Sequence, residues 1–193
     1  DQLIRTNFPE DRLHFVGFYT QARRYRIGDI PELAPKEVTL MGSTVNLRLD
    51  YDRIQDRSIL ERIPQHFTNL QKGLETARRI LAQEESNNKV IFLVTDGLPT
   101  AYHQGSSLHL TYPPTEATLK ATLAEVSRCT EDKIAINTFM MGNEVDGGYF
   151  GEQEFLEKLS LLNRGRLFYP APDKLTQFVL VDYVRNKKRL AQL

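Results

Sequence analysis

The sequence is poor in cysteine, in excess charge of either sign and in long apolar runs. Cys129 is the only cysteine among 193 residues, so no disulfide can form within the chain and no zinc site built from several cysteines is encoded. Lys plus Arg and Asp plus Glu both number 25, and this balance argues against a protein that binds nucleic acid or anionic membranes through excess positive charge. No apolar stretch approaches the roughly 20 residues of a membrane-spanning helix, and no signal peptide is visible. We therefore expect a cytoplasmic protein with no membrane insertion and no nucleic-acid partner.

Motifs that mark common enzyme classes in α/β proteins are also absent. The chain contains no Gly-x-Ser-x-Gly nucleophile turn, no Gly-x-x-x-x-Gly-Lys phosphate loop and no Gly-x-Gly-x-x-Gly dinucleotide turn. A phosphohydrolase that used Asp96 would want a second carboxylate two residues later, where Leu98 stands. We therefore expect that the protein is not an enzyme. A hydrolase with Asp96 as nucleophile or metal ligand is the lesser alternative.

The chain is organised around one apolar segment, residues 90–95, which ends at Asp96. Its residues have strong β character, and such a continuous run is typical of a central parallel strand that is buried on both faces. Gly97 and Pro99 then force a turn, and we expect positive φ at Gly97. In open α/β sheets, ligands bind beyond the carboxyl ends of the strands, so Asp96 stands where such a fold carries its site. A carboxylate at this place can also simply cap a loop or a helix.

Hydrophobic periodicity predicts alternating strands and helices along the rest of the chain. Strands are expected at residues 13–19, 22–27, 134–140 and 165–169. Helices are expected at residues 68–81, 115–129 and 152–162 and in the segment 172–193. This order predicts an α/β fold with one domain over residues 1–193, doubly wound, with a mostly parallel central sheet, one antiparallel edge strand and helices on both faces.

Other segments give weaker signals. Residues 1–7 resemble the end of a helix, residues 38–49 a surface hairpin and residues 58–63 a short helix. Residues 96–114 are expected to form a long polar loop that carries His103 and His109. Cys129, near a helix end, is expected to be a partly buried small residue with no catalytic base beside it.

Two segments together resemble the von Willebrand factor type A (VWA) domain. The first is His66-Phe67-Thr68-Asn69-Leu70-Gln71-Lys72-Gly73-Leu74, with its Thr-x-Leu helix start, and the second is the strand that ends in Thr95-Asp96-Gly97. Residues 15–19 and 22–27 are similar to the family's second and third strands, and residues 137–142 to a later one. The resemblance covers essentially the whole chain, and it implies a Rossmann-like fold with a metal-ion-dependent adhesion site (MIDAS).

The resemblance also implies which residues hold the metal. Thr68 would supply a hydroxyl ligand and Asp96 a carboxylate to one Mg²⁺ (or Mn²⁺) ion, a hard cation that takes oxygen ligands and keeps several waters. An acidic side chain of a partner protein would complete the coordination. The alternative for Thr68 is an N-cap without any metal. His66, His103 and His109 could form a second metal site, although loop histidines are more often solvated.

One family motif is missing from the sequence. The Asp-x-Ser-x-Ser motif that follows the family's first strand occurs nowhere in the chain, and the first strand is missing too. That strand would lie between residues 13–19 and 90–95, and a sheet without it leaves two rows of backbone groups unpaired. We therefore expect that the strand and its motif lie upstream of the given chain. Metal binding without them is expected to be weak or absent.

The resemblance extends to a possible partner. Residues 126–130, 163–169 and 179–185 are similar to bacterial VWA proteins that resemble the subunits working with MoxR-type or magnesium-chelatase-type AAA+ ATPases. It implies a protein-interaction adaptor, with the ATPase as a separate chain. The alternative is a metal-free VWA scaffold that keeps the fold without the site.

Overall fold

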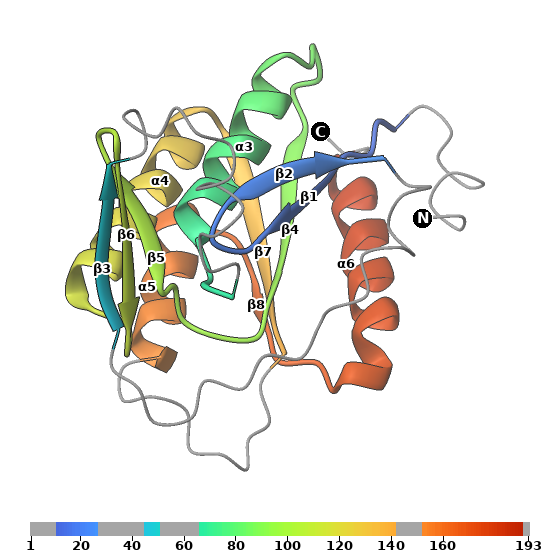
Figure 1. Ribbon diagram of the computed structural model, residues 1–193. Coiled ribbons are helices and arrows are strands. Elements are labelled where there is room, and N and C mark those ends of the chain that lie inside the picture. Colours follow the sequence, from blue (N-terminus) through green and yellow to red (C-terminus); the bar gives the residue numbers. More distant parts are fainter. Residues whose placement is uncertain (1–10, 27–44, 51–65, 142–151, 191–193) are drawn as a thin grey trace.

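The computed structural model describes residues 11–26, 45–50, 66–141 and 152–190 (Figure 1). In chain order the elements are β1 (Phe15–Phe18), β2 (Ala22–Tyr25), β3 (Val45–Asp50), α3 (Leu70–Ala82), β4 (Lys89–Thr95), β5 (Ala101–Gln104), β6 (Ser107–Tyr112), α4 (Glu116–Glu131), β7 (Ile134–Met140), α5 (Glu152–Asn163), β8 (Leu167–Phe168), the 3-10 helix η4 (Pro172–Lys174) and α6 (Leu175–Leu190). The helices predicted at 1–7 and 58–63 lie outside the described residues. Of the helices that the structure describes, none is both long and apolar enough to cross a membrane.

Strands β4, β7 and β8 form a parallel sheet with β7 in the middle. β4 pairs with β7 along its whole length, from Lys89 opposite Ile134 to Thr95 opposite Met140. Helices α3, α4 and α5 cover one face of this sheet, and α6 covers the other (Figure 1). The predicted α/β arrangement with helices on both faces is therefore confirmed for these strands.

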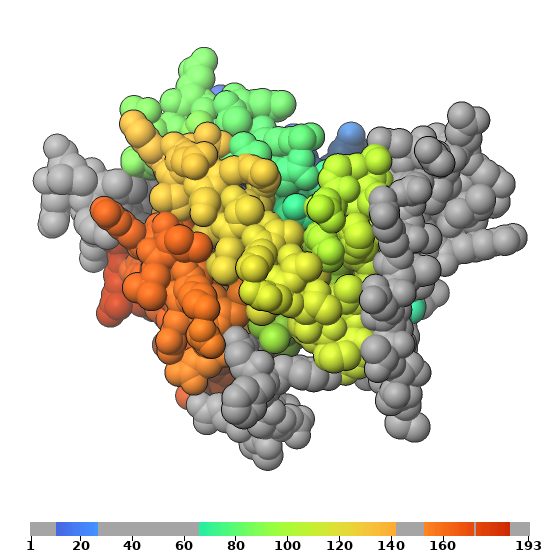
Figure 2. Space-filling view, turned by 90° about the vertical axis from the view of Figure 1, so that its left-hand side faces the viewer, coloured from blue at the N-terminus to red at the C-terminus, as the bar shows by residue number. Residues whose placement is uncertain are grey.

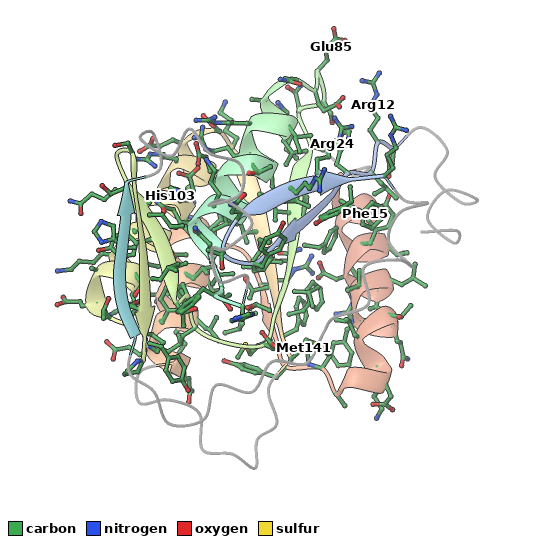
Figure 3. The ribbon with its side chains drawn as sticks, viewed as in Figure 1. Arg12, Phe15, Arg24, Glu85, His103 and Met141 are labelled. Atoms are coloured by element: carbon green, nitrogen blue, oxygen red, sulfur yellow. The ribbon has the colours of Figure 1, made fainter. Side chains whose placement is uncertain are left out.

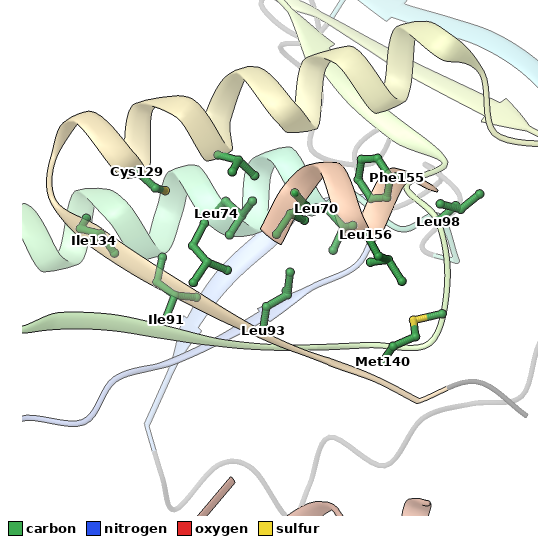
Figure 4. Close-up of a cluster of buried hydrophobic side chains, with 13 residues drawn as sticks. Leu70, Leu74, Ile91, Leu93, Leu98, Cys129, Ile134, Met140, Phe155 and Leu156 are labelled. Carbon is green, nitrogen blue, oxygen red and sulfur yellow. The ribbon is translucent and has the colours of Figure 1, made fainter. Parts of the chain in front are cut away.

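The side chains of β4 alternate between two cores. Ile91 and Leu93 are buried in the larger core with side chains of α3, α4 and α5 (Figure 4). Phe92 points to the opposite face, where its ring centroid lies 6.0 Å from that of Phe139 and 6.3 Å from that of Tyr183 in α6. Successive side chains of a strand face opposite sides. The unbroken apolar run of β4 is therefore what a strand covered on both faces requires.

The described strands form three sheets rather than the single, mostly parallel sheet that we expected. β1 and β2 form the predicted antiparallel hairpin, but β1 does not pair with β4. β3, β6 and β5 form a separate antiparallel sheet, which packs against α3 and α4 through β5. In Figure 2, α5, α4 and the β5–β6 hairpin lie side by side on one face of the molecule. β3 pairs with β6, a partner that the sequence did not predict, and the other half of the hairpin predicted over residues 38–49 lies outside the described residues.

The prediction of a long polar loop over residues 96–114 is wrong. Residues 101–104 and 107–112 are paired strands joined at Gly105, whose φ of 59° is the left-handed conformation that glycine adopts readily. Leu108 and Leu110 are fully buried, and His109 between them is less so. Leucines at alternate positions are typical of a strand. The polar residues Ser107, His109 and Thr111 around them resemble those of a loop, although Ser107 and Thr111 are also buried.

A close main-chain contact fixes the connection from α5 to β8. A Cβ atom at Gly165 would lie 1.7 Å from the main-chain oxygen of Ile136 in β7, so only glycine fits there. The buried Asn163 side chain bridges the same elements, because its amide donates to Ile134 O over 2.9 Å and its oxygen accepts from Ile136 N. These contacts hold β8 in the sheet, although it is only two residues long.

Candidate metal and partner site

Thr68 lies immediately before α3, and main-chain hydrogen bonds join it to the segment that follows β4. Its N–H donates to Thr100 Oγ1 over 2.8 Å. Its carbonyl oxygen accepts from Thr100 N over 2.9 Å and from Ala101 N over 3.2 Å. The structure therefore brings the start of α3 against the end of the turn that Asp96 begins. Thr100 is a positioning residue that the sequence reasoning missed.

Asn69, not Thr68, caps α3. Asn69 Oδ1 accepts from Lys72 N over 2.9 Å, while Asn69 Nδ2 donates to Thr20 O over 3.0 Å and lies 3.3 Å from His103 Nδ1. The alternative that Thr68 serves as the N-cap is therefore wrong. Within the described ranges the Thr68 hydroxyl has no hydrogen-bond partner, so it does not take part in capping α3.

Asp96 leaves the sheet at the carboxyl end of β4, where its side chain is exposed. Thr95 O accepts from Met141 N over 2.8 Å, and Thr95 Oγ1 donates to Gly97 O over 3.1 Å. These bonds fix the main chain on both sides of Asp96. Leu98 then returns to the buried core, which also contains Met140 (Figure 4). In the part of the chain that the structure describes, the Asp96 carboxylate has no ion pair or hydrogen bond.

The turn forms without the backbone conformation that we expected of Gly97. Gly97 does not have positive φ, and a Cβ atom there would meet no atom within 4 Å. The Thr95 hydroxyl and the buried Leu98 side chain shape the turn instead. The prediction for Gly97 is therefore wrong.

His103 and His109 are strand residues rather than solvated loop residues. His103 lies beside α3 (Figure 3), and Gln71 clamps its main chain: His103 N donates to Gln71 Oε1 over 2.7 Å, and Gln71 Nε2 donates to His103 O over 3.1 Å. Burial lowers the pKa of the His103 imidazole, and the positive charge of Lys72 lowers it further. The His109 ring stacks on Tyr102 with centroids 4.6 Å apart. His66 is exposed.

The chemistry available at this edge of the sheet is that of oxygen donors. A threonine hydroxyl and a carboxylate are both ligands that Mg²⁺ and Mn²⁺ accept. The described ranges contain no group of three or more His, Cys, Asp or Glu side chains that could hold a metal ion. Thr68 and Asp96 therefore have the chemistry of two such ligands, and the remaining ligands of a site would come from water, a partner or residues outside the described ranges.

Comparison with known families decides the affiliation of this fold. The model of the family described as "Rv0959-like protein, vWA domain" matches residues 1–184. The chain belongs to this vWA family. The resemblance drawn from the segments around Thr68 and Asp96 is thus confirmed.

Three mycobacterial proteins are similar to this vWA chain. They are the proteins named "Uncharacterized protein Rv0959" and "Uncharacterized protein MT0986" of Mycobacterium tuberculosis (strains H37Rv and CDC 1551) and "Uncharacterized protein Mb0984" of Mycobacterium bovis. Each is 28% identical over 192 residues, which is 97% of this chain and 24% of the relative. The chain therefore spans about a quarter of the length of these curated relatives.

Proposed function

We propose that this vWA domain binds one divalent cation, Mg²⁺ or Mn²⁺, through Thr68 and Asp96 and recognises an acidic side chain of a partner protein through that ion. The observation that carries the proposal is the pair of hydrogen bonds between the main chain of Thr68 and Thr100. They tie the hydroxyl-bearing residue to the turn that presents Asp96, at the carboxyl edge of the parallel sheet. A hard cation keeps open or water-filled positions that a partner carboxylate can enter.

The residues around the two ligands act by positioning them. Thr100 holds Thr68 in place, Asn69 takes over the capping of α3, and Leu98 anchors the turn after Asp96 in the core. Asp96 brings one negative charge, whereas the Thr68 hydroxyl is neutral. Because affinity for a divalent cation rises with the number of charged ligands, one carboxylate supports only weak binding. A strong site requires the acidic motif expected upstream.

We extend the proposal to the partner, a MoxR-type AAA+ ATPase for which this domain acts as a non-enzymatic adaptor in the bacterial cytoplasm. The similarity of residues 126–130, 163–169 and 179–185 to VWA proteins of that kind supports this choice. The test is co-purification of the full-length protein with the ATPase in Mg²⁺ and in EDTA. Association that is lost in EDTA and in Asp96→Asn supports a metal-bridged complex, and association unchanged in both contradicts it.

A metal-free scaffold is the second candidate function. It is favoured by the single carboxylate at the candidate site and by the finding that no three potential ligand side chains of the His, Cys, Asp or Glu type cluster within the described ranges. In that case the same surface would bind a partner without an ion, and EDTA would leave the complex intact.

Calorimetric titration with Mg²⁺ and with Mn²⁺ tests the metal site directly. We would compare residues 1–193 with the chain extended to its native start, each also as Thr68→Val and Asp96→Asn. The matched controls are Thr176→Val and Asp173→Asn, whose side chains are exposed on α6 and η4. Binding by the extended protein that is lost in both site variants and kept in both controls supports the proposal. Absence of binding by the extended protein would establish the scaffold instead.

A further inference from the structure

Three exposed arginines lie at β2, the second strand of the β1–β2 hairpin. Arg23 and Arg24 belong to the strand and Arg26 follows it, whereas Tyr25 between them is half-buried. The chain as a whole carries as many acidic as basic residues, so this run is a local excess of positive charge. Among the described strands, β2 pairs with β1 alone. Basic side chains and a strand edge with no described partner strand therefore coincide.

The arginines of β2 lie on both faces of the hairpin. Phe18 of β1 packs against α3. Side chains alternate between the two faces of a strand, and Arg24 pairs with Val16, two residues before Phe18, so Arg24 is on the α3 face. Arg23 pairs with Gly17 and is therefore on the opposite face. A segment placed beside β2 would thus meet an arginine on each side of its own main chain.

A chain of hydrogen bonds orients the Arg24 side chain. Arg24 Nη2 lies 2.9 Å from His14 Nδ1, and His14 Nε2 lies 2.9 Å from Glu84 Oε1, beyond the end of α3. Guanidinium nitrogens only donate, so Nδ1 accepts and the neutral imidazole donates through Nε2 to the carboxylate. Arg12 donates to the other oxygen of Glu84 over 2.7 Å, and Figure 3 shows Arg12 and Arg24 near this end of α3. The Arg24 guanidinium is therefore held in place before any partner arrives.

The other two arginines have donors to spare. Within the described ranges, neither Arg23 nor Arg26 forms an ion pair or hydrogen bond through its side chain. A guanidinium presents five N–H donors in a planar fork that matches a carboxylate. Charged side chains on a strand can also serve only to keep two edges apart. That role needs no oriented side chain, so the bonds from Arg24 to His14 and on to Glu84 favour a surface that binds.

We propose that the edge of β2 is a docking site for an extended, acidic segment of a partner protein, which adds to the β1–β2 hairpin as a further strand. Alternate residues of β2 direct their main-chain N–H and C=O groups away from β1, and an added strand pairs with them. Side chains directly opposite each other on neighbouring strands lie about 5 Å apart, within reach of an arginine–carboxylate pair. Because Arg23 and Arg24 face opposite sides, the segment should carry Asp or Glu at consecutive positions.

Two other occupants fit this edge less well. A second copy of the chain, paired through its own β2, would bring arginines together, and like charges on neighbouring strands destabilise a sheet. The phosphates of a nucleic acid would pair with the arginines but offer no regular row of donors and acceptors to the main chain of β2. An acidic peptide matches both the guanidinium groups and the main-chain edge.

Fluorescence anisotropy on the full-length protein tests the docking site. The probe is the labelled peptide fluorescein-Gly-Thr-Glu-Glu-Val-Glu-Glu-Thr-amide, measured in EDTA so that the candidate metal site makes no contribution. We expect saturable binding that Arg23→Gln and Arg24→Gln each weaken by about 3-fold to 5-fold. The matched control Arg164→Gln, an exposed arginine between α5 and β8, should leave the dissociation constant unchanged.

Two control peptides separate a docked strand from simple charge attraction. Replacing every Glu of the probe by Gln removes the carboxylates and should weaken binding by at least about 10-fold. Methylating every main-chain nitrogen keeps the charge but removes the hydrogen-bond donors, and it should also weaken binding by at least about 10-fold. Hydrogen–deuterium exchange of the full-length protein should slow at residues 22–26 when the unmodified peptide is bound.

The remaining outcomes would overturn the proposal. Absence of peptide binding would leave the arginines as a guard of the strand edge. Equally tight binding of the N-methylated peptide or of oligothymidylate would assign the surface to polyanions in general. Self-association that slows exchange at residues 22–26 without peptide would assign the edge to a second copy. None of these measurements involves a metal, so this proposal and the proposed function can fail separately.

Discussion

Replacing Asn69 by alanine tests whether one buried amide holds the candidate site together. The Asn69 side chain is 0% exposed and contacts three elements, through Lys72 N in α3, Thr20 O after β1 and His103 Nδ1 in β5. It immediately follows Thr68, so its loss would loosen both the start of α3 and the position of the proposed hydroxyl ligand. No nearby described side chain repeats this set of contacts.

The expected loss of stability follows from two of these bonds. Removing an asparagine N-cap costs about 1 kcal/mol. Thr20 is fully buried, and losing the hydrogen bond from Asn69 Nδ2 to its carbonyl oxygen costs about 0.5–1.5 kcal/mol. Asn69→Ala should therefore lower the free energy of unfolding by about 1.5–2.5 kcal/mol, a large share of the roughly 5–15 kcal/mol of an ordinary domain. Asn69→Ser keeps a good cap but cannot reach Thr20, so it should recover about 1 kcal/mol of this loss.

Urea denaturation followed by circular dichroism measures these differences. The matched control is Asn87→Ala, an exposed position between α3 and β4, which should change the free energy of unfolding by less than about 0.5 kcal/mol. A loss below about 1 kcal/mol for Asn69→Ala, or a loss equal to that of Asn87→Ala, would refute the reasoning, because neither the cap nor the buried carbonyl would then depend on this amide.

Three further predictions follow from buried groups. Because burial lowers the pKa of His103 below its usual 6.5, the unfolded chain binds the proton more readily, so this contribution to stability should be complete above about pH 6.5 and fall below it. Urea midpoints measured at about pH 7 and 5.5 should therefore differ less in His103→Gln than in the unsubstituted protein, whereas the exposed-residue control His66→Gln should not reduce the difference. Gly165→Ala should lower the free energy of unfolding by at least about 3 kcal/mol and lower the thermal midpoint, because its Cβ would overlap a main-chain oxygen of β7. The control Gly97→Ala, with open space around its Cβ, should change the thermal midpoint little. Cys129 is fully buried and its pKa is raised to about 12 by burial, so a thiol reagent at pH 8 should label it only after unfolding; labelling of the native protein at the rate of a free thiol would contradict this.

The long periodic elements of this fold could be predicted from the sequence because local pattern decides them. The helix expected at residues 68–81 is α3, and the strands expected at 90–95 and 134–140 are β4 and β7. In each case one face or both faces of the element are apolar at the right spacing, and burial of those side chains supplies the stability.

Pairing between distant segments could not be predicted in the same way. β3 pairs with β6 across more than fifty intervening residues, and nothing in residues 45–50 alone selects that partner. The β5–β6 hairpin did leave a local signal, in Leu108 and Leu110 with Gly105 at the turn, but its polar residues resemble those of a loop. Short half-covered strands depend on tertiary contacts more than on their own composition.

The resemblance to the VWA family names two candidate ligands but not the residues that position them. Thr68 and Asp96 stay predictions as ligands, and the structure leaves both side chains without partners among the described residues. The contact between Thr68 and Thr100, which joins the start of α3 to the segment after β4, is revealed only by the folded chain. Asn69 carried a signal of its own, because asparagine is among the best N-caps and stands directly before the first apolar position of α3.

The candidate metal site lacks ligands that the strand and motif expected upstream would supply. If that strand docks between β1 and β4 and brings the remaining metal ligands to Asp96, then Mg²⁺ binding and strand docking must be thermodynamically linked. A ligand that binds only the native state stabilises it by about 2.7 kcal/mol at 100 times its dissociation constant. Saturating Mg²⁺ should therefore raise the urea midpoint of the extended protein and leave that of residues 1–193 unchanged. Equal stabilisation of both proteins would show that metal binding does not depend on the strand.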